Sequence, residues 1–148
     1  MRYEIKPFEA LSGLEVYKMV MLREAIFVVE QDCPYQDSDG QDVECDLMLV
    51  WDDERLVGTL RLVPAGVRYE KLSIGRVVVD EAYRGKGIAF EMMQQALAYI
   101  KLTHGPVEVV LSGQVAIKSL YERCDFKIIS GIYQEDGIDH VKMLYTYE

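Results

Sequence analysis

The sequence has little cysteine, little histidine and an excess of negative charge. Its 148 residues include three cysteines and two histidines, and no two cysteines have the C-x-x-C spacing. This pattern disfavours zinc sites and disulfide frameworks, so we expect a protein of a reducing, cytoplasmic compartment that binds no metal. The formal net charge of −9 disfavours nucleic acid and anionic membranes as partners, because both require a basic surface.

Long apolar segments are also missing. No apolar run approaches the roughly 18 residues that would predict a membrane span, and the first residues lack the apolar core of a signal peptide. There is no repeat and no low-complexity linker. We therefore expect a single domain over residues 1–148, and the hydrophobic half of the composition suffices for one sizeable core.

The apolar periodicity predicts an α/β domain with a mixed central sheet of about six or seven strands flanked by helices. A strand, a helix and a further strand in the second half indicate a parallel pair with a right-handed crossover. The expected strands are 2–8, 47–51, 55–63, 71–80, 107–111, 126–133 and 140–147, and the expected helices are 12–29, 88–104 and 116–124.

Several details of these elements are predicted as well. Ser12 and Glu15 have the spacing of a capping box. Helical spacing relates Leu14, Tyr17, Met21, Leu22, Ala25 and Ile26 in the first helix, and in the last it directs Ile117, Leu120 and Tyr121 inward. The run 77–79 is typical of a strand buried on both faces, and the Asp136-Gly137 pair predicts a tight hairpin.

Two glycines, Gly85 and Gly87, lie between that buried strand and a helix, with Arg84 and Lys86 beside them. A glycine loop that leads into a helix N-terminus directs backbone amides and the helix dipole at one point, which favours an anion such as a pyrophosphate. The spacing is not G-x-G-x-x-G, and no Lys-Ser/Thr pair follows. A P-loop phosphotransferase is thereby excluded.

The pattern Arg84-x-x-Gly87-x-Ala89 resembles the R/Q-x-x-G-x-G/A signature of the GNAT superfamily of acetyltransferases, whose loop amides hold the pyrophosphate of acetyl-CoA. The resemblance implies the GNAT fold and acetyl-CoA as donor. It also implies a set of cofactor-binding residues: Val77, Val78, Val79, Arg84, Gly85, Lys86, Gly87, Ile88, Ala89 and Gln114.

Residues 114–126 are similar to the family's N-x-x-A-x-x-L-Y-x-x-x-G-F, in which the tyrosine protonates the departing CoA thiolate. This implies that Tyr121 is a general acid. The chain departs from the motif at Gln114, at Ile117 and at Asp125, where asparagine, a small residue and glycine are usual. The glycine's replacement predicts a different helix end.

Four further segments resemble the ElaA-like branch of the GNAT superfamily. They read L-R-x-x-I-F-V-V-E-Q-x-C-P-Y-x-D-x-D at 22–39, L-R-L-V-P at 60–64, I-G-R-V at 74–77 and Y-x-E-D-G-I-x-H at 133–140. Together they extend the resemblance over nearly the whole chain.

The expected activity is an acetyl-CoA-dependent N-acetyltransferase that transfers the acetyl group directly to a primary amine. An amine must lose its proton before it attacks, and we predict Glu30 as the base, with Asp32, Glu135, His140 and water as the alternatives. A backbone amide at Val79 or its neighbour is expected to hold the oxyanion. Arg61 and Arg76, within apolar strands, either pair with the acidic loop, residues 30–42, or bind an acidic acceptor.

Two other functions remain open at this point. One is a non-catalytic acyl-CoA-binding regulatory domain, which the presence of Tyr121 disfavours. The other is an acyltransferase similar to acyl-homoserine-lactone synthases, which share the Arg23-x-x-x-Phe27 segment. The edge strands and the pair Tyr145 and Tyr147 are compatible with a homodimer.

Overall fold

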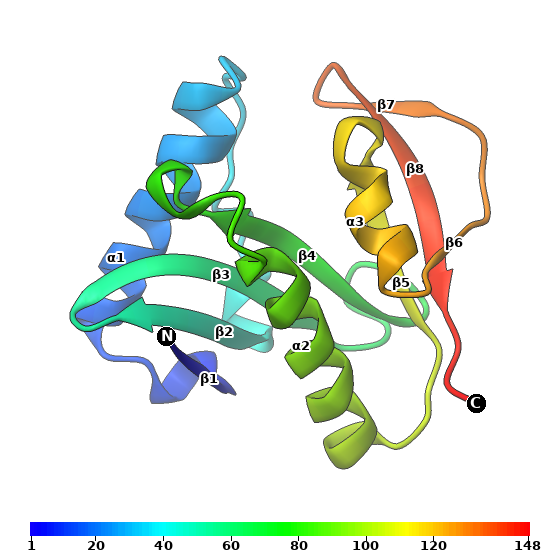
Figure 1. Ribbon diagram of the computed structural model, residues 1–148, viewed down its shortest axis with the longest axis horizontal. Helices are drawn as coiled ribbons and strands as arrows, with labels where there is room; N and C mark the ends of the chain where they lie inside the picture. The colour runs from blue at the N-terminus through cyan, green and yellow to red at the C-terminus, as the bar shows by residue number, and fades with distance from the viewer.

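The computed structural model covers all 148 residues and contains a single mixed sheet of eight strands with helices on both faces (Figure 1). The strands are β1 (Arg2–Pro7), β2 (Asp46–Asp52), β3 (Arg55–Val63), β4 (Leu72–Val79), β5 (Val109–Gln114), β6 (Lys127–Ile128), β7 (Tyr133–Glu135) and β8 (Ile138–Tyr145). The helices are α1 (Gly13–Arg23), α2 (Ile88–His104) and α3 (Lys118–Arg123). None of them is both long and apolar enough to cross a bilayer.

The strand order is β1-β2-β3-β4-β5-β8-β6, and β7 also pairs with β8. All pairs are antiparallel except β4 and β5, which α2 connects as the predicted crossover. The mixed α/β fold is therefore confirmed. The expected strand 126–133 is instead divided into β6 and β7 around Ser130-Gly131, and β7 turns into β8 through Asp136 and Gly137, both at positive φ.

Helix α1 begins at the predicted capping box, where the Ser12 hydroxyl accepts from the Glu15 amide at 3.1 Å. It continues as a π-helical segment, η2 (Glu24–Glu30). The predicted apolar stripe is only partly buried. Leu22 and Ile26 face the sheet, but Leu14, Tyr17 and Met21 are exposed because Met19 and Arg23 occupy the inner face instead.

Two apolar clusters fill the two faces of the sheet. One side of β2, β3 and β4 packs against Met19, Leu22 and Ile26 of α1 and η2. The other side packs against α2 through Met92, Met93 and other side chains, and this cluster also includes Tyr121 and Cys124 at α3. Figure 1 shows α2 crossing in front of β3 and β4, with α3 beside β5 and β8.

The last helix departs from its expected form. A short turn, η5 (Val115–Ile117), precedes α3, and Ile117, predicted to be buried, is exposed. Asp125 adopts φ +69°, the left-handed conformation that a glycine would take at a helix end. The amide of Phe126 then donates to the Tyr121 carbonyl at 3.0 Å. The helix therefore ends as a glycine would end it, contrary to the prediction.

The C-terminal tyrosines pack within the chain. The Tyr145 ring lies 5.4 Å from that of Phe126 and 4.8 Å from that of Tyr147. The Tyr147 hydroxyl donates to the carbonyl of Leu97 in α2. These contacts fasten the end of the chain to the main core.

Candidate active site

Strand β4 departs from regular geometry at the centre of the sheet. Thr59 of β3 is opposite Val78, but Arg61, two residues on, is opposite Gly75, so β4 contains one extra residue there. Arg76, at φ +51°, is part of this bulge. On the other edge, β4 pairs with β5 only at Leu72 and Ser73. Beyond that point the edge of β4 has no strand partner, so its backbone polar groups are available to a ligand.

A cleft of about 390 Å³ opens where β4 and β5 diverge. Its walls come from β4, η2, the N-terminus of α2, and η5 with α3. The lining includes seven of the predicted site residues: Glu30, Val77, Val78, Val79, Arg84, Ala89 and Gln114. The expectation that 77–79 is buried on both faces is wrong, because only Val78 is buried and its two neighbours are half-buried against this cleft.

Arg84 and Ala89, which flank the glycine loop, line this cleft, whereas the predicted site residues between them, 85–88, are not among its lining residues. Gly85 and Gly87 adopt φ +76° and +77°, and a Cβ at either position would meet nothing within 4 Å. The first bond of α2 runs from the Glu91 amide to the Gly87 carbonyl at 3.1 Å. The amides of residues 88 to 90 therefore have no intrahelical acceptor. Free amides at the positive end of a 17-residue helix make an anion site.

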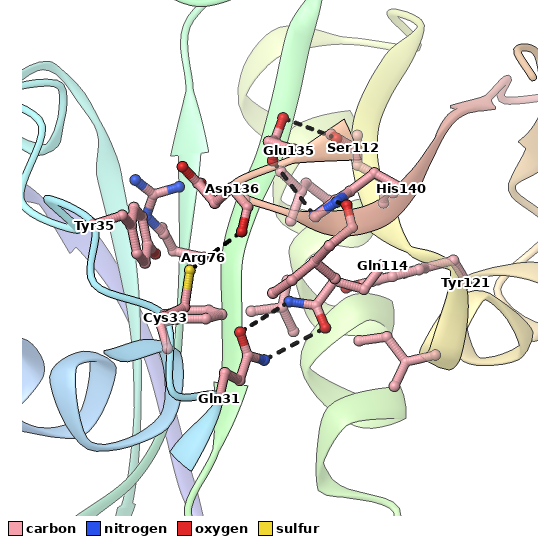
Figure 2. Close-up of a pocket in the computed structure, with 17 residues that line it drawn as sticks. Gln31, Cys33, Tyr35, Arg76, Ser112, Gln114, Tyr121, Glu135, Asp136 and His140 are labelled. Carbon is pink, nitrogen blue, oxygen red and sulfur yellow. Dashed lines mark hydrogen bonds and ion pairs between the residues drawn. The ribbon is translucent and has the colours of Figure 1, made fainter. Parts of the chain in front are cut away.

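A second pocket, of about 80 Å³, adjoins the first and is the one drawn in Figure 2. It lies between the loop after η2, strand β4 and the β7–β8 hairpin. The two cavities share Phe27, Gln31, Val77, Gln114 and Ile117 as lining residues. They therefore meet beside the bulge of β4.

Gln31 and Gln114 bridge the two halves of the molecule at this junction. Each side-chain amide donates to the other's oxygen, at 3.4 and 3.3 Å, and the paired dashed lines in Figure 2 mark this contact. Nearby, the Cys33 thiol donates to the Asp136 carbonyl at 3.3 Å. These contacts connect the loop after η2 to β5 and to the β7–β8 hairpin, across the second pocket.

Glu135 is the most highly connected acid in the second pocket. Its Oε1 accepts from Arg68 Nη2 at 3.1 Å and from the Ser112 hydroxyl at 3.3 Å. Its Oε2 lies 3.5 Å from His140 Nε2. The Nδ1 of His140 is 2.7 Å from the Ile138 carbonyl, which fixes the proton on Nδ1 and directs Nε2 at Glu135. A carboxylate and an imidazole thus face each other and can share a proton.

Tyr121 reaches the same pocket from α3 (Figure 2). Its side chain is 5% exposed, and burial raises the pKa of its hydroxyl above the ordinary value. The ring packs tightly on β5, since a Cβ at Gly113 would lie 3.1 Å from it. The hydroxyl is therefore protonated across the working pH range and rigidly placed.

Glu30, the predicted base, lies at the edge of the first cleft and not in the pocket of Tyr121 and Glu135. Its Oε2 is 2.9 Å from Arg84 Nη1, in an ion pair between two part-exposed side chains. Arg84 also donates from Nε to the Val79 carbonyl at 3.3 Å. This position connects η2 to the glycine loop.

The acidic loop is held by three arginines. Arg23, 1% exposed, binds Asp37 at 2.8 Å and Asp42 at 2.7 Å. Arg61 makes two parallel contacts of 2.9 Å with Asp39, and Arg76 lies 2.8 Å from Asp37. The expectation that Arg61 and Arg76 pair with the loop is therefore met. Although burial opposes it, hydrogen bonding from Arg61 holds the pKa of Asp39 well below its usual range.

Comparison with known proteins assigns the family. The sequence model of the acetyltransferase (GNAT) domain matches residues 16–147. The chain belongs to the GNAT family. Protein ElaA of Escherichia coli K12 is 36% identical to this GNAT chain over 135 residues, which cover 90% of this chain and 88% of ElaA.

Solved structures agree with this assignment. The crystal structure of E. coli ElaA has a TM-score of 0.91 at 32% identity, over 97% of this chain and 99% of that one. An acyl-CoA N-acyltransferase from Pseudomonas aeruginosa has a TM-score of 0.90 at 36% identity, over 97% of both chains. The AHL synthase LasI, at 17% identity and a TM-score of 0.78 over 97% of this chain and 88% of its own, shares the fold.

The GNAT and ElaA-like resemblance predicted from the sequence is therefore confirmed, and with it membership of a family of acyl-CoA N-acyltransferases. Sequence reasoning did not identify three polar residues of this GNAT site. Gln31 lies in the segment 22–39 and Ser112 lies just before the segment 114–126, but their partners are distant in sequence. Arg68 lies in a loop without any motif.

Proposed function

We propose that this GNAT protein is an acetyl-CoA-dependent N-acetyltransferase that transfers the acetyl group directly to a primary amine. One observation carries the proposal: the cleft with the glycine loop and the pocket with Tyr121 and Glu135 meet beside the bulge of β4. Donor and acceptor would then approach from two sides and meet at the unpaired edge of β4. Direct transfer within one ternary complex requires such an arrangement.

The donor half of the proposal rests on the glycine loop. Gly85 and Gly87 leave open space above the free amides of α2, where a pyrophosphate would accept several charge-assisted hydrogen bonds of about 1.5–3 kcal/mol each. Arg84 and Lys86 are both exposed beside this site, where Lys86 adds positive charge and Arg84 is paired with Glu30. The unpaired edge of β4 at 77–79 would bind the amides of the pantetheine arm in the manner of an added strand.

An acetyl donor fits the junction better than a long acyl chain. Phe27, Val77 and Ile117 line both cavities where they meet, and the pocket beyond has a volume of about 80 Å³. A long chain and an acceptor would compete for this space. Transfer of a long acyl chain, as in a function similar to that of acyl-homoserine-lactone synthases, therefore fits this site less well than transfer of an acetyl group.

The chemistry needs a base, a site for the oxyanion and an acid. Glu135 and His140, which face each other in the pocket, would take the proton from the ammonium form of the acceptor; Glu30 is already paired with Arg84. The amine nitrogen then bonds to the thioester carbon while the unpaired edge of β4, near Val79, supports the oxyanion. The carbon–sulfur bond breaks, Tyr121 protonates the leaving thiolate, and the surplus proton of the attacking nitrogen returns to the Tyr121 oxygen as the amide forms.

Thiol release from acetyl-CoA tests this proposal directly. A panel of small amines, peptides and free amino acids is incubated with the protein and acetyl-CoA or octanoyl-CoA. We expect acceptor-dependent thiol release, because the protein is proposed to be catalytic. The kcat/KM for acetyl-CoA should exceed that for octanoyl-CoA at least about tenfold, which corresponds to a difference of about 1.4 kcal/mol in binding of the transition state. Acetyl-CoA binding without release for any acceptor would instead favour a regulatory acyl-CoA-binding domain.

A further inference from the structure

A narrow cavity extends the acceptor pocket away from the donor cleft. It has a volume of about 40 Å³, enough for a few non-hydrogen atoms, and it shares Ile74, Gly75, Arg76, Ser112 and Glu135 with the pocket of Tyr121. On its far side a wide, shallow mouth shares Arg68, Tyr69 and Glu135 with it. Glu135 therefore borders all three spaces, which adjoin one another between the surface and the bulge of β4.

This narrow cavity contains a buried donor without a partner. The guanidinium of Arg61 is 1% exposed, and its two terminal nitrogens are bound by Asp39. Its Nε has no hydrogen-bond partner. An unpaired buried N–H is costly unless a ligand or water satisfies it. Gly75, directly opposite Arg61 across the β3–β4 ladder, has no side chain to fill the space beside this Nε.

The charges along these spaces are unusual for this chain. Four cations line the cavity and its mouth, namely Arg61, Arg68, Arg76 and Lys142, against Glu135 as the one carboxylate. The chain as a whole has a net charge of −9. Lys142 takes part in no ion pair within 4.0 Å and stacks instead on the Tyr69 ring, 3.8 Å from its centroid. Arg61 and Arg76 are ion-paired with Asp39 and Asp37, and Arg68 with Glu135. Lys142 is therefore the cation that remains to attract an anion at the mouth.

We propose that the acceptor is a primary amine that also carries a carboxylate a few bonds away, as amino acids and related compounds do. The carboxylate occupies the narrow cavity and accepts from Arg61 Nε, with the hydroxyl of Ser73 or Ser112 beside it. The amine projects into the adjoining pocket toward Glu135 and His140. Lys142 attracts the acceptor at the mouth. This inference rests on the proposed function, since it assigns the acceptor of that same reaction.

The opposite charges have separate places in this arrangement. The ammonium group faces Glu135, while the carboxylate faces Arg61. Burial lowers the pKa of Arg61, but its hydrogen bonds to Asp39 and the negative charges near it together raise it by more, so Arg61 is always charged. A diamine would place a second cation among arginines and would be repelled. An uncharged amine would leave Arg61 Nε unsatisfied. The cavity therefore selects for the carboxylate as well as for the amine.

Matched acceptors test this assignment. Thiol release is measured with pooled amino acids, with the corresponding amino-acid amides, and with simple diamines. We expect kcat/KM for the amino-acid pool to exceed that for either other pool by at least about tenfold. This ratio corresponds to the free energy of one hydrogen bond to a charged group. Equal or better use of the amides or the diamines would overturn the assignment.

A glycine-to-alanine change tests the cavity itself. In Gly75→Ala the new Cβ meets nothing closer than Arg61 Nε at 3.8 Å, and the backbone there is not left-handed, so the fold accommodates it. The methyl group occupies the carboxylate's place. We expect KM for amino acids to rise about tenfold, with KM for acetyl-CoA and the unfolding temperature unchanged. Gly13→Ala, where a Cβ meets nothing within 4 Å, is the control. An unchanged KM for amino acids in Gly75→Ala would refute the placement.

Binding measurements separate this inference from the catalytic proposal. Amino acids and their amides are titrated calorimetrically into protein saturated with CoA, which requires no turnover. Preferential binding of the free carboxylates without any thiol release would support the acceptor class and overturn the catalytic proposal. Thiol release without a carboxylate preference would support the catalytic proposal and overturn the acceptor class. Absence of both would overturn both.

Discussion

Replacement of Tyr121 by phenylalanine removes a single oxygen atom from the site. The ring is closely packed between Gly113 and Phe126, whose ring centroid is 6.3 Å away, and it keeps those contacts in the variant. No side chain hydrogen bonds to the hydroxyl, so its loss should change the unfolding free energy by no more than ~0.5 kcal/mol. Loss of a general acid typically lowers the rate by about 10²–10⁴, or roughly 2.7–5.4 kcal/mol in the barrier.

The assay is steady-state thiol release with wild type, Tyr121→Phe and Tyr145→Phe. Tyr145 is the matched control, because its ring also packs on Phe126 but outside both cavities. We expect kcat of Tyr121→Phe to fall at least about 10²-fold with little change in either KM. Burial raises the pKa of Tyr121, so the wild-type rate should show no decline from tyrosine ionisation up to about pH 10.

The leaving group gives a sharper criterion than the rate alone. An acid that protonates the departing sulfur matters less when that sulfur is a weaker base. An acetyl thioester of a more acidic thiol should therefore restore much of the activity of Tyr121→Phe. If the variant loses activity equally with both donors, Tyr121 acts through position and not through proton transfer. A kcat within threefold of wild type would refute the assignment altogether.

Three further outcomes follow from the geometry. Gly87→Ala, forced to φ +77° at about 1–2 kcal/mol, should raise KM for acetyl-CoA, whereas Gly105→Ala at φ +79° at the other end of α2 should lower stability only. Glu135→Gln should lower kcat by about 10², whereas Glu30→Gln should chiefly raise KM for acetyl-CoA. The folded-state pKa of Asp39 is depressed, so its contribution to stability is present above the unfolded pKa of about 3.9. That contribution is lost as pH falls toward the folded-state pKa. Asp39→Asn should therefore flatten the acid denaturation curve below about pH 4.

Local rules predicted the parts of this protein whose structure depends on nearby residues. The capping box at Ser12 and the Asp136-Gly137 turn each depend on residues within a few positions, and both formed as expected. The glycine loop has the same character, since its two left-handed residues and its helix are contiguous. Periodicity alone did not select the inner face of α1, because Leu14 and Met21 satisfy the same spacing as Leu22.

Long-range pairing explains the remaining differences. Arg23 decides which face of α1 is buried. It faces inward because it binds Asp37 and Asp42, which lie 14 and 19 positions further along the chain. No apolar pattern shows that a charged residue belongs inside. The sequence predicts Glu30 as a base because it ends the first helix, and that role stays a prediction; its partner Arg84 lies 54 residues on. Only the fold brings such partners together.

One extra residue in β4 accounts for the relation between the two halves of the site. With Arg76 at φ +51°, its guanidinium reaches Asp37 and fixes the loop that lines the pocket of Tyr121 and Glu135. The same bulge precedes Val77, which lines both cavities at the point where β4 has already separated from β5. The bulge therefore lies beside the gap that begins where the β4–β5 ladder ends, at Ser73. The left-handed arginine thus costs strain of about 1–3 kcal/mol, and its ion pair with the loop offsets that strain where the site requires an open edge.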